Sequence, residues 1–141
     1  FNFIHLVFNM LWLKVLGQAI EHVRGRTRFL AMVLVIAILS NVSQFFFQIS
    51  LDRTPWLNWQ PSPFFGGMSG VVYGLFGYVW MKQRFEPQLG LGMSKENIVI
   101  MIGWLVICAM NWMGPVANTA HLVGLLAGMV LGVAGLLFRR R

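Results

Sequence analysis

Three observations on the sequence predict an all-α membrane protein that folds as a polytopic bundle of helices. Of its 141 residues, 57% are hydrophobic and only 11% are charged, whereas about 25% of the residues in a soluble domain are charged. The apolar residues form long runs, and the run at 122–138 contains no polar side chain, so it lacks the polar face of a surface helix. The basic residues cluster between these runs, as they do at the ends of membrane spans. The lipid bilayer is therefore the expected environment of the chain.

Five apolar segments are expected to be transmembrane helices. Crossing a hydrocarbon core of about 30 Å takes about 20 helical residues. The first, second and fifth segments reach that length, the fourth is slightly short and the third is clearly short. The segments cover residues 1–20, 29–49, 69–81, 98–113 and 116–138.

The positions of the basic residues predict the orientation of these helices. Nine of the 11 Lys and Arg residues lie between the first two segments, between the third and fourth, or after the fifth. Positive residues favour the cytoplasmic side, so these loops and the C-terminus should be cytoplasmic, with Lys82 marking the cytoplasmic end of the third segment. The proline-rich loop at 51–67 should lie outside and dip into the membrane surface. Despite a net charge of +7, no basic stripe with interleaved aromatics is present, so no nucleic-acid partner is expected.

Depth in the membrane singles out four polar residues. The third segment is only about 21 Å long, so Ser69 should begin it about 9 Å below the outer edge of the hydrocarbon. Irregular backbone at that depth must be buried in protein or line a water-filled cavity. The same rise per residue places His121 about 8 Å, His5 about 6 Å and Asn9 about 12 Å deep. Ionisable groups within a membrane are candidates for function, and these four share one layer.

Small residues predict close packing of the third segment on the fifth. The fifth carries small residues at every fourth position, and the third carries three glycines; they are Ala120, Gly124, Gly128, Gly132 and Gly70, Gly74, Gly77. Such small-xxx-small faces let helix backbones approach. We therefore expect Ser69 and His121 to come within reach of each other, although the same glycines are also explained by helix packing alone.

The residue inventory favours serine chemistry over the other intramembrane mechanisms. An aspartyl mechanism needs two carboxylates within helices, but the only aspartate is Asp52, in a loop. A zinc mechanism needs HExxH, which is absent, and His5 and His121 are too few ligands. Neither a metal nor any other cofactor is expected.

A serine mechanism needs a nucleophile, a base and hydrogen-bond donors for an oxyanion. Ser69 follows two glycines at a predicted helix N-terminus, whose free N–H groups suit an oxyanion, and His121 supplies a base. No carboxylate is suitably placed to complete a triad, so a Ser-His dyad is predicted. Tyr73, one turn after Ser69, can stack against the imidazole of His121.

Three motifs together resemble those of the rhomboid proteases of the bacterial GlpG type. HLVFN at 5–9 resembles the family's HxxxN motif, and FGGMSGVVY at 65–73 resembles its GxSG motif with the downstream tyrosine. AHLVG at 120–124, followed by Gly128, resembles AHxxGxxxG. Each motif is weak alone, but the order and spacing agree along the whole chain.

The resemblance implies the roles of the remaining site residues. Ser69 would be the nucleophile and His121 the general base and acid. His5, Asn9 and the backbone N–H of Ser69 would form the oxyanion hole, with Gly67 lining it. Tyr73 would pack under His121, and Gly124 and Gly128 would support it by helix packing.

The resemblance also implies that residues 1–141 are one rhomboid membrane domain, incomplete at its N-terminus. The family core has six helices, and the first helix and the long outer loop have no counterpart here. We therefore expect the chain to begin inside a helix, with an earlier span missing. The implied activity is that of a serine endopeptidase cleaving single-span membrane proteins in a bacterial inner membrane, with the active site open to the periplasmic side.

Two other functions are alternatives for this sequence. One is a catalytically silent rhomboid-like protein that binds membrane proteins without cutting them; the presence of both Ser69 and His121 argues against it. The other is a small transporter or channel, which would need polar residues along a path at mid-depth. The lower halves of the third, fourth and fifth segments lack them.

Overall fold

The computed structural model describes residues 3–52, 67–110 and 117–139, and these ranges fold into a bundle of α-helices. Five α-helices and one 3-10 helix occur in these ranges: α1 (Phe3–Arg24), α2 (Arg26–Asp52), α3 (Ser69–Phe85), η1 (Pro87–Leu89), α4 (Lys95–Ala109) and α5 (Asn118–Arg139). The predicted all-α class and the five predicted α-helices are confirmed.

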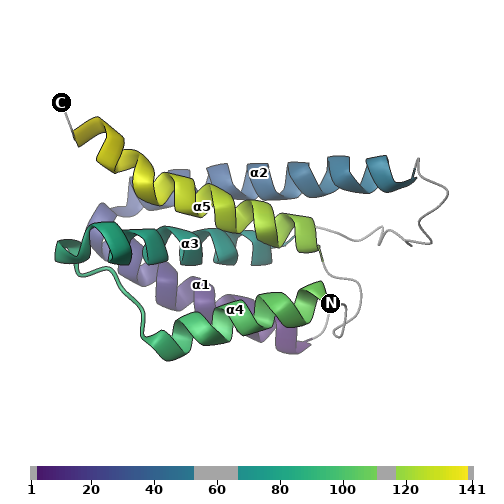
Figure 1. Cartoon of the computed structure of the whole chain (residues 1–141), viewed down its shortest axis with the longest axis horizontal. Coiled ribbons are helices and arrows are strands. Elements are labelled where there is room, and N and C mark those ends of the chain that lie inside the picture. Colours follow the sequence, from purple (N-terminus) through teal and green to yellow (C-terminus); the bar gives the residue numbers. More distant parts are fainter. Residues whose placement is uncertain (1–2, 53–66, 111–116, 140–141) are drawn as a thin grey trace.

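Each α-helix runs opposite to the one before it, so that loops alternate between the two ends of the bundle (Figure 1). Helices α1 and α2 form a hairpin around Gly25, whose φ of 81° lies in the left-handed region, where glycine is favoured. The N–H of Gly25 donates to the carbonyl of Glu21 at 2.8 Å, which caps the end of α1. The turn is so tight that α2 begins at the next residue.

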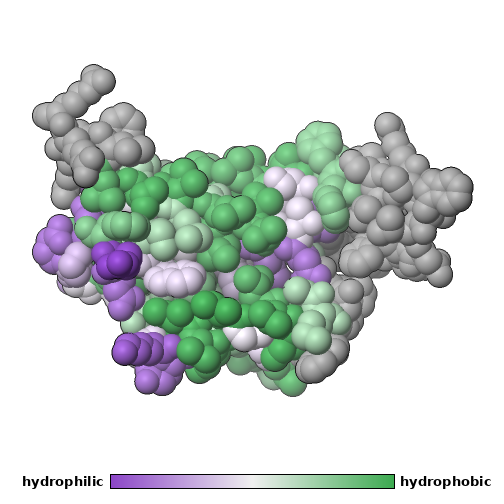
Figure 2. Space-filling model, in the orientation of Figure 1, coloured by the Kyte–Doolittle hydropathy of each residue, from purple (hydrophilic) through white to green (hydrophobic). Residues whose placement is uncertain are grey.

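Among the described residues, three helices are long and apolar enough to cross a membrane: Phe3–Arg24, the Arg26–Phe47 part of α2 and the Asn118–Leu136 part of α5. Helices α3 and α4, with 17 and 15 residues, are shorter, as expected from their segments. Hydrophobic side chains cover the middle of the face shown in Figure 2, and hydrophilic ones gather mainly at the end where α3 terminates. An apolar belt with a polar end is the surface that a bilayer requires.

Helix α3 lies at the centre of the bundle. Its residues from Gly70 to Val79 are all buried. With 17 residues, the helix is also shorter than a typical lipid-facing span. Helix α1 packs against this centre through Trp12, Leu16 and Ile20, which follow one another at every fourth position. Because α3 is enclosed by its neighbours, its N-terminus can lie below the membrane surface without exposing backbone to lipid.

Glycines bring the backbones of α3 and α5 into direct contact. A Cβ atom added at Gly70 would lie 3.0 Å from the carbonyl oxygen of Ala120, and one added at Gly74 would lie 3.0 Å from that of Gly124. A Cβ atom at Gly128 would overlap the carbonyl group of Gly74. The predicted close packing of the third segment on the fifth is confirmed.

One predicted boundary is wrong. The sequence predicts that the third segment ends at Met81, with Lys82 marking its cytoplasmic end, but α3 continues to Phe85. Lys82 is only 2% exposed, and it forms a buried ion pair with Glu86 one turn later. A charged residue with a partner can remain within a helix, and no hydropathy pattern reveals that partner.

Two other sequence predictions fall on residues outside the description. Most of the loop at 51–67 belongs to the undescribed range 53–66, and the end of the fourth segment belongs to 111–116.

Replacement of Gly128 by alanine is expected to destabilise the bundle, because the new methyl group has no space against α3. Overpacking of this kind costs about 1–3 kcal/mol. The control is Gly103→Ala on α4, where an added Cβ meets nothing within 4 Å. Thermal unfolding followed by circular dichroism in detergent should show a lower midpoint for Gly128→Ala alone; equal midpoints would contradict the close packing.

Candidate active site

The serine and the histidine singled out from the sequence form a hydrogen-bonded pair. The Oγ of Ser69 lies 2.9 Å from Nε2 of His121, although 52 residues separate them. Ser69 is the first residue of α3, and His121 lies in the first turn of α5. The glycine contacts described above hold these two helix ends side by side, so the pair depends on the small residues of both helices.

The pair is largely enclosed by protein. His121 is 1% exposed, whereas Ser69 is half-buried. A partly accessible hydroxyl beside a buried imidazole is an arrangement that suits attack on an incoming group, because the imidazole is shielded while the hydroxyl can be reached.

Tyr73 packs against the imidazole, as predicted. The centroids of the Tyr73 and His121 rings are 4.9 Å apart, with an angle of 44° between the planes. The hydroxyl of Tyr73 donates to the carbonyl oxygen of Met101 at 3.2 Å, which ties α3 to α4. This hydrogen bond fixes the tyrosine ring, and the ring in turn restricts the imidazole.

No carboxylate supports His121 within the described residues. Its buried Nδ1 has no hydrogen-bond partner there. In a serine triad a carboxylate would occupy that position. Within the part of the chain that the structure describes, His121 is therefore held by its hydrogen bond to Ser69 and by the ring contact with Tyr73.

The N-terminus of α3 supplies donors beside the hydroxyl of Ser69. The first N–H groups of a helix have no acceptor within the helix, and the positive end of the helix dipole favours a negative charge there. The residue preceding the helix, Met68, provides no side-chain cap. These N–H groups can therefore serve a ligand.

His5 and Asn9 lie on α1, the helix packed against the other side of α3. His5 is half-buried and Asn9 is 6% exposed. The amide of Asn9 donates to the carbonyl oxygen of His5 at 2.8 Å, so one of its two N–H groups is used within α1. The second N–H is the one that Asn9 could offer to an oxyanion.

Two residues of α2 that the sequence did not indicate also hold this region together. The side-chain oxygen of Gln44 accepts from the N–H of Ala120 at 3.1 Å, capping the first turn of α5 beside His121. The side-chain oxygen of Asn41 accepts from the N–H of Gly67 at 3.3 Å, just before Ser69. The sequence does show Asn41 and Gln44 as polar residues within an apolar run. That pattern does not specify which groups they bind.

Fold and site together define a class: multi-pass helical membrane proteins with a serine and a histidine paired where two closely packed helices begin. Within the described ranges, no three His, Cys, Asp or Glu residues come together as metal ligands would.

Comparison with known proteins identifies the family. The family model of the rhomboid domain matches residues 1–138. The chain is 33% identical over 142 aligned positions to the rhomboid protease GlpG of Salmonella paratyphi A, and 34% identical to that of Salmonella choleraesuis. The alignments cover 100% of this chain and 47% of each relative, so the chain spans about half the length of these proteins. The chain belongs to the rhomboid family.

Replacement of Gln44 by leucine is expected to lower the stability of α5 against the bundle, because the N–H of Ala120 loses its partner. Loss of a helix cap costs about 0.5–2 kcal/mol. The matched control is Gln18→Leu, since Gln18 is exposed on α1. Hydrogen exchange should speed up at the start of α5 in Gln44→Leu and stay unchanged in Gln18→Leu. Unchanged exchange in both variants would show that the cap does not matter.

Proposed function

We propose that this chain is the membrane domain of a serine endopeptidase that hydrolyses peptide bonds in or near the transmembrane helices of other membrane proteins. The observation that carries this proposal is the 2.9 Å hydrogen bond between Ser69 and His121. Membership of the rhomboid family and the printed names of the GlpG relatives support it.

In the proposed reaction, Nε2 of His121 takes the proton of the Ser69 hydroxyl as Oγ attacks the substrate carbonyl carbon. The carbonyl oxygen becomes an oxyanion, stabilised by the N–H of Ser69 at the α3 N-terminus and by the side chains of His5 and Asn9, with Gly67 beside them. His121 then donates its proton to the leaving nitrogen, and the C–N bond breaks to leave an acyl-enzyme. Water, activated by His121, releases the second product and restores the serine hydroxyl.

The imidazole in this proposal forms a dyad with Ser69. With no carboxylate on Nδ1 in the described residues, the contact with Tyr73 takes over the task of holding the ring. Gly124 and Gly128 act indirectly, because they let α5 approach α3 closely enough for the hydrogen bond to form.

The proposed substrates are single-span membrane proteins. A transmembrane helix hides its carbonyl groups in its own hydrogen bonds, so the substrate must unwind locally before Ser69 can attack. Helix-breaking residues near the scissile bond should therefore favour cleavage. The proposed location is a bacterial inner membrane, with a cytoplasmic C-terminus and the dyad open to the periplasmic side, because the basic loops lie at the opposite end of the helices.

A fluorophosphonate probe is expected to label Ser69 of the full-length protein, because only an activated serine reacts with it. Ser69→Ala should abolish labelling and reduce cleavage of a single-span substrate at least 1,000-fold, roughly the effect of removing a catalytic serine. Ser43→Ala on α2 is the matched control and should retain both. An unlabelled but folded wild-type protein would instead favour the catalytically silent binder.

Cleavage is expected to slow as the pH falls, because only the neutral imidazole of His121 can accept the serine proton. Initial rates measured from about pH 8 downward, through and below the range in which histidines commonly titrate, should decline on the acid side and recover on return to neutral pH. A rate that stays constant down to the pH at which the protein begins to unfold would contradict the assignment of His121 as the base.

A further inference from the structure

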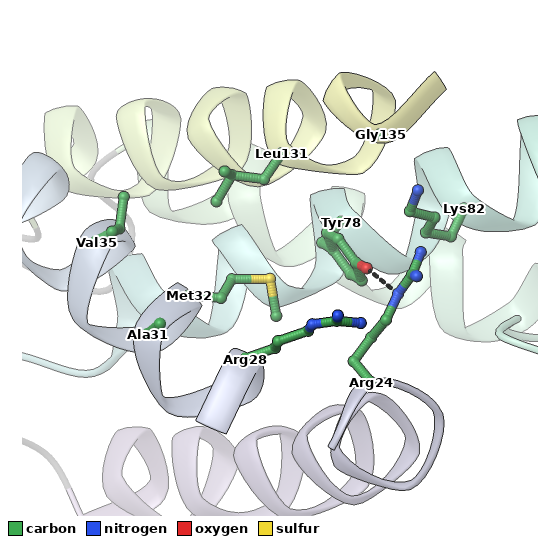
Figure 3. A pocket seen from close by; sticks show the side chains of 9 residues that line it. All are labelled: Arg24, Arg28, Ala31, Met32, Val35, Tyr78, Lys82, Leu131 and Gly135. Atoms are coloured by element: carbon green, nitrogen blue, oxygen red, sulfur yellow. Dashed lines mark hydrogen bonds between the residues drawn. The ribbon is translucent and has the colours of Figure 1, made fainter. Parts of the chain in front are cut away.

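A pocket lies at the end of the bundle away from the Ser69–His121 pair. It has a volume of about 440 Å³ and opens between α2 and α5 (Figure 3). Two of its lining residues, Tyr78 and Lys82, follow Ser69 by 9 and 13 positions on α3, which corresponds to about 14 and 20 Å along the helix. The volume is in the range of small-ligand sites, and the proposed catalytic mechanism does not use this pocket.

Three basic side chains converge at one end of this pocket. Arg24, Arg28 and Lys82 line it, and Figure 3 shows Arg28 extending from the start of α2 toward Arg24, whose side chain runs from the end of α1 toward Tyr78 and Lys82. The carboxylate of Glu86 pairs with Lys82 and also lies 3.8 Å from Arg24. Three positive charges therefore face one negative charge, which leaves a net charge of +2.

The two arginines have different surroundings. Arg24 is fixed, because its Nε donates to the hydroxyl of Tyr78 at 2.7 Å. Arg28 is exposed, and among the described residues it forms no ion pair. Its guanidinium is thus available to an anion entering from outside, while Arg24 holds a second guanidinium nearby in a set position.

The other end of the pocket is apolar. Met32 and Val35 of α2 and Leu131 of α5 line it, and Figure 3 shows Met32 and Leu131 facing the same space between the two helices. The outer surface of α2 beside it is also apolar, with Leu34 and Ile38 exposed. A ligand that fits this pocket therefore combines an anionic head with a hydrocarbon tail.

We propose that this pocket binds one anionic phospholipid. The phosphate lies between Arg28 and Arg24, since guanidinium groups bind phosphate oxygens through paired hydrogen bonds, and an acyl chain lies along Met32, Val35 and Leu131. Basic pockets between transmembrane helices suit such headgroups. A zwitterionic lipid brings its own positive charge toward this basic cluster, so it binds less tightly, and free phosphate gains nothing from the apolar end.

The test is a lipid titration of the full-length protein in detergent, followed by native mass spectrometry. Phosphatidylglycerol is expected to bind at least about fivefold more tightly than phosphatidylcholine of the same acyl chains. Arg28→Gln should weaken binding of phosphatidylglycerol about fivefold, the effect of losing one basic residue at a membrane surface, and should leave phosphatidylcholine unchanged. Arg28→Lys keeps the charge and should retain most of the preference.

Arg26→Gln is the matched control. Arg26 is exposed at the start of α2 like Arg28, and it does not line the pocket, so its loss should change binding less than twofold. Equal weakening by both variants would reduce the effect to general surface charge and overturn the site. Equal binding of phosphatidylglycerol and phosphatidylcholine would also overturn the proposed lipid site. This result is expected if another segment of the protein fills the pocket. Binding of glycerol phosphate as tight as that of phosphatidylglycerol would show an anion site instead of a lipid site.

Discussion

The close approach of α3 and α5 is the constraint on which the rest of the structure depends. Where Gly124 and Gly128 face Gly70 and Gly74, backbone meets backbone without side chains between them. Helices associate in a bilayer through close packing of this kind, because the hydrophobic effect does not drive apolar helices together within lipid. The contact also keeps α3 enclosed, so a helix too short to span the membrane can end below its surface. The hydrogen bond of Ser69 to His121 is a result of that geometry.

Contacts from the other helices then limit how the pair can move. Gln44 and Asn41 of α2 bind the backbone at Ala120 and Gly67, and Tyr73 joins the imidazole to α4 through Met101. Each contact satisfies a polar group that would be costly to leave unpaired in an apolar bundle. Helices α2, α3, α4 and α5 thus all contribute to the position of one imidazole ring, whose Nδ1 has no hydrogen-bond partner among the described residues.

The opposite end of the bundle is organised by charge. Lys82 and Glu86 form a buried ion pair at the end of α3, and Arg24 joins it from α1 while binding Tyr78. A buried ion pair contributes little net stability, because desolvation opposes the attraction, but removal of one partner is strongly destabilising. This cluster therefore fixes where α1 and α3 end relative to each other, and it leaves a net positive charge beside the proposed lipid pocket.

The sequence by itself determined the all-α membrane fold, the five helices and the start of α3 at Ser69, and it predicted that packing of α3 on α5 brings Ser69 within reach of His121. Each follows from local features: long apolar runs, basic clusters, and small residues at every fourth position, which leave few ways to pack. Only the tertiary structure decided that Lys82 lies within α3, that Gln44 caps α5 and that Arg24 reaches Tyr78. These contacts join residues of different helices or depend on burial. A hydropathy pattern indicates that a polar side chain is unfavourable in lipid, but it does not identify the partner that satisfies this side chain.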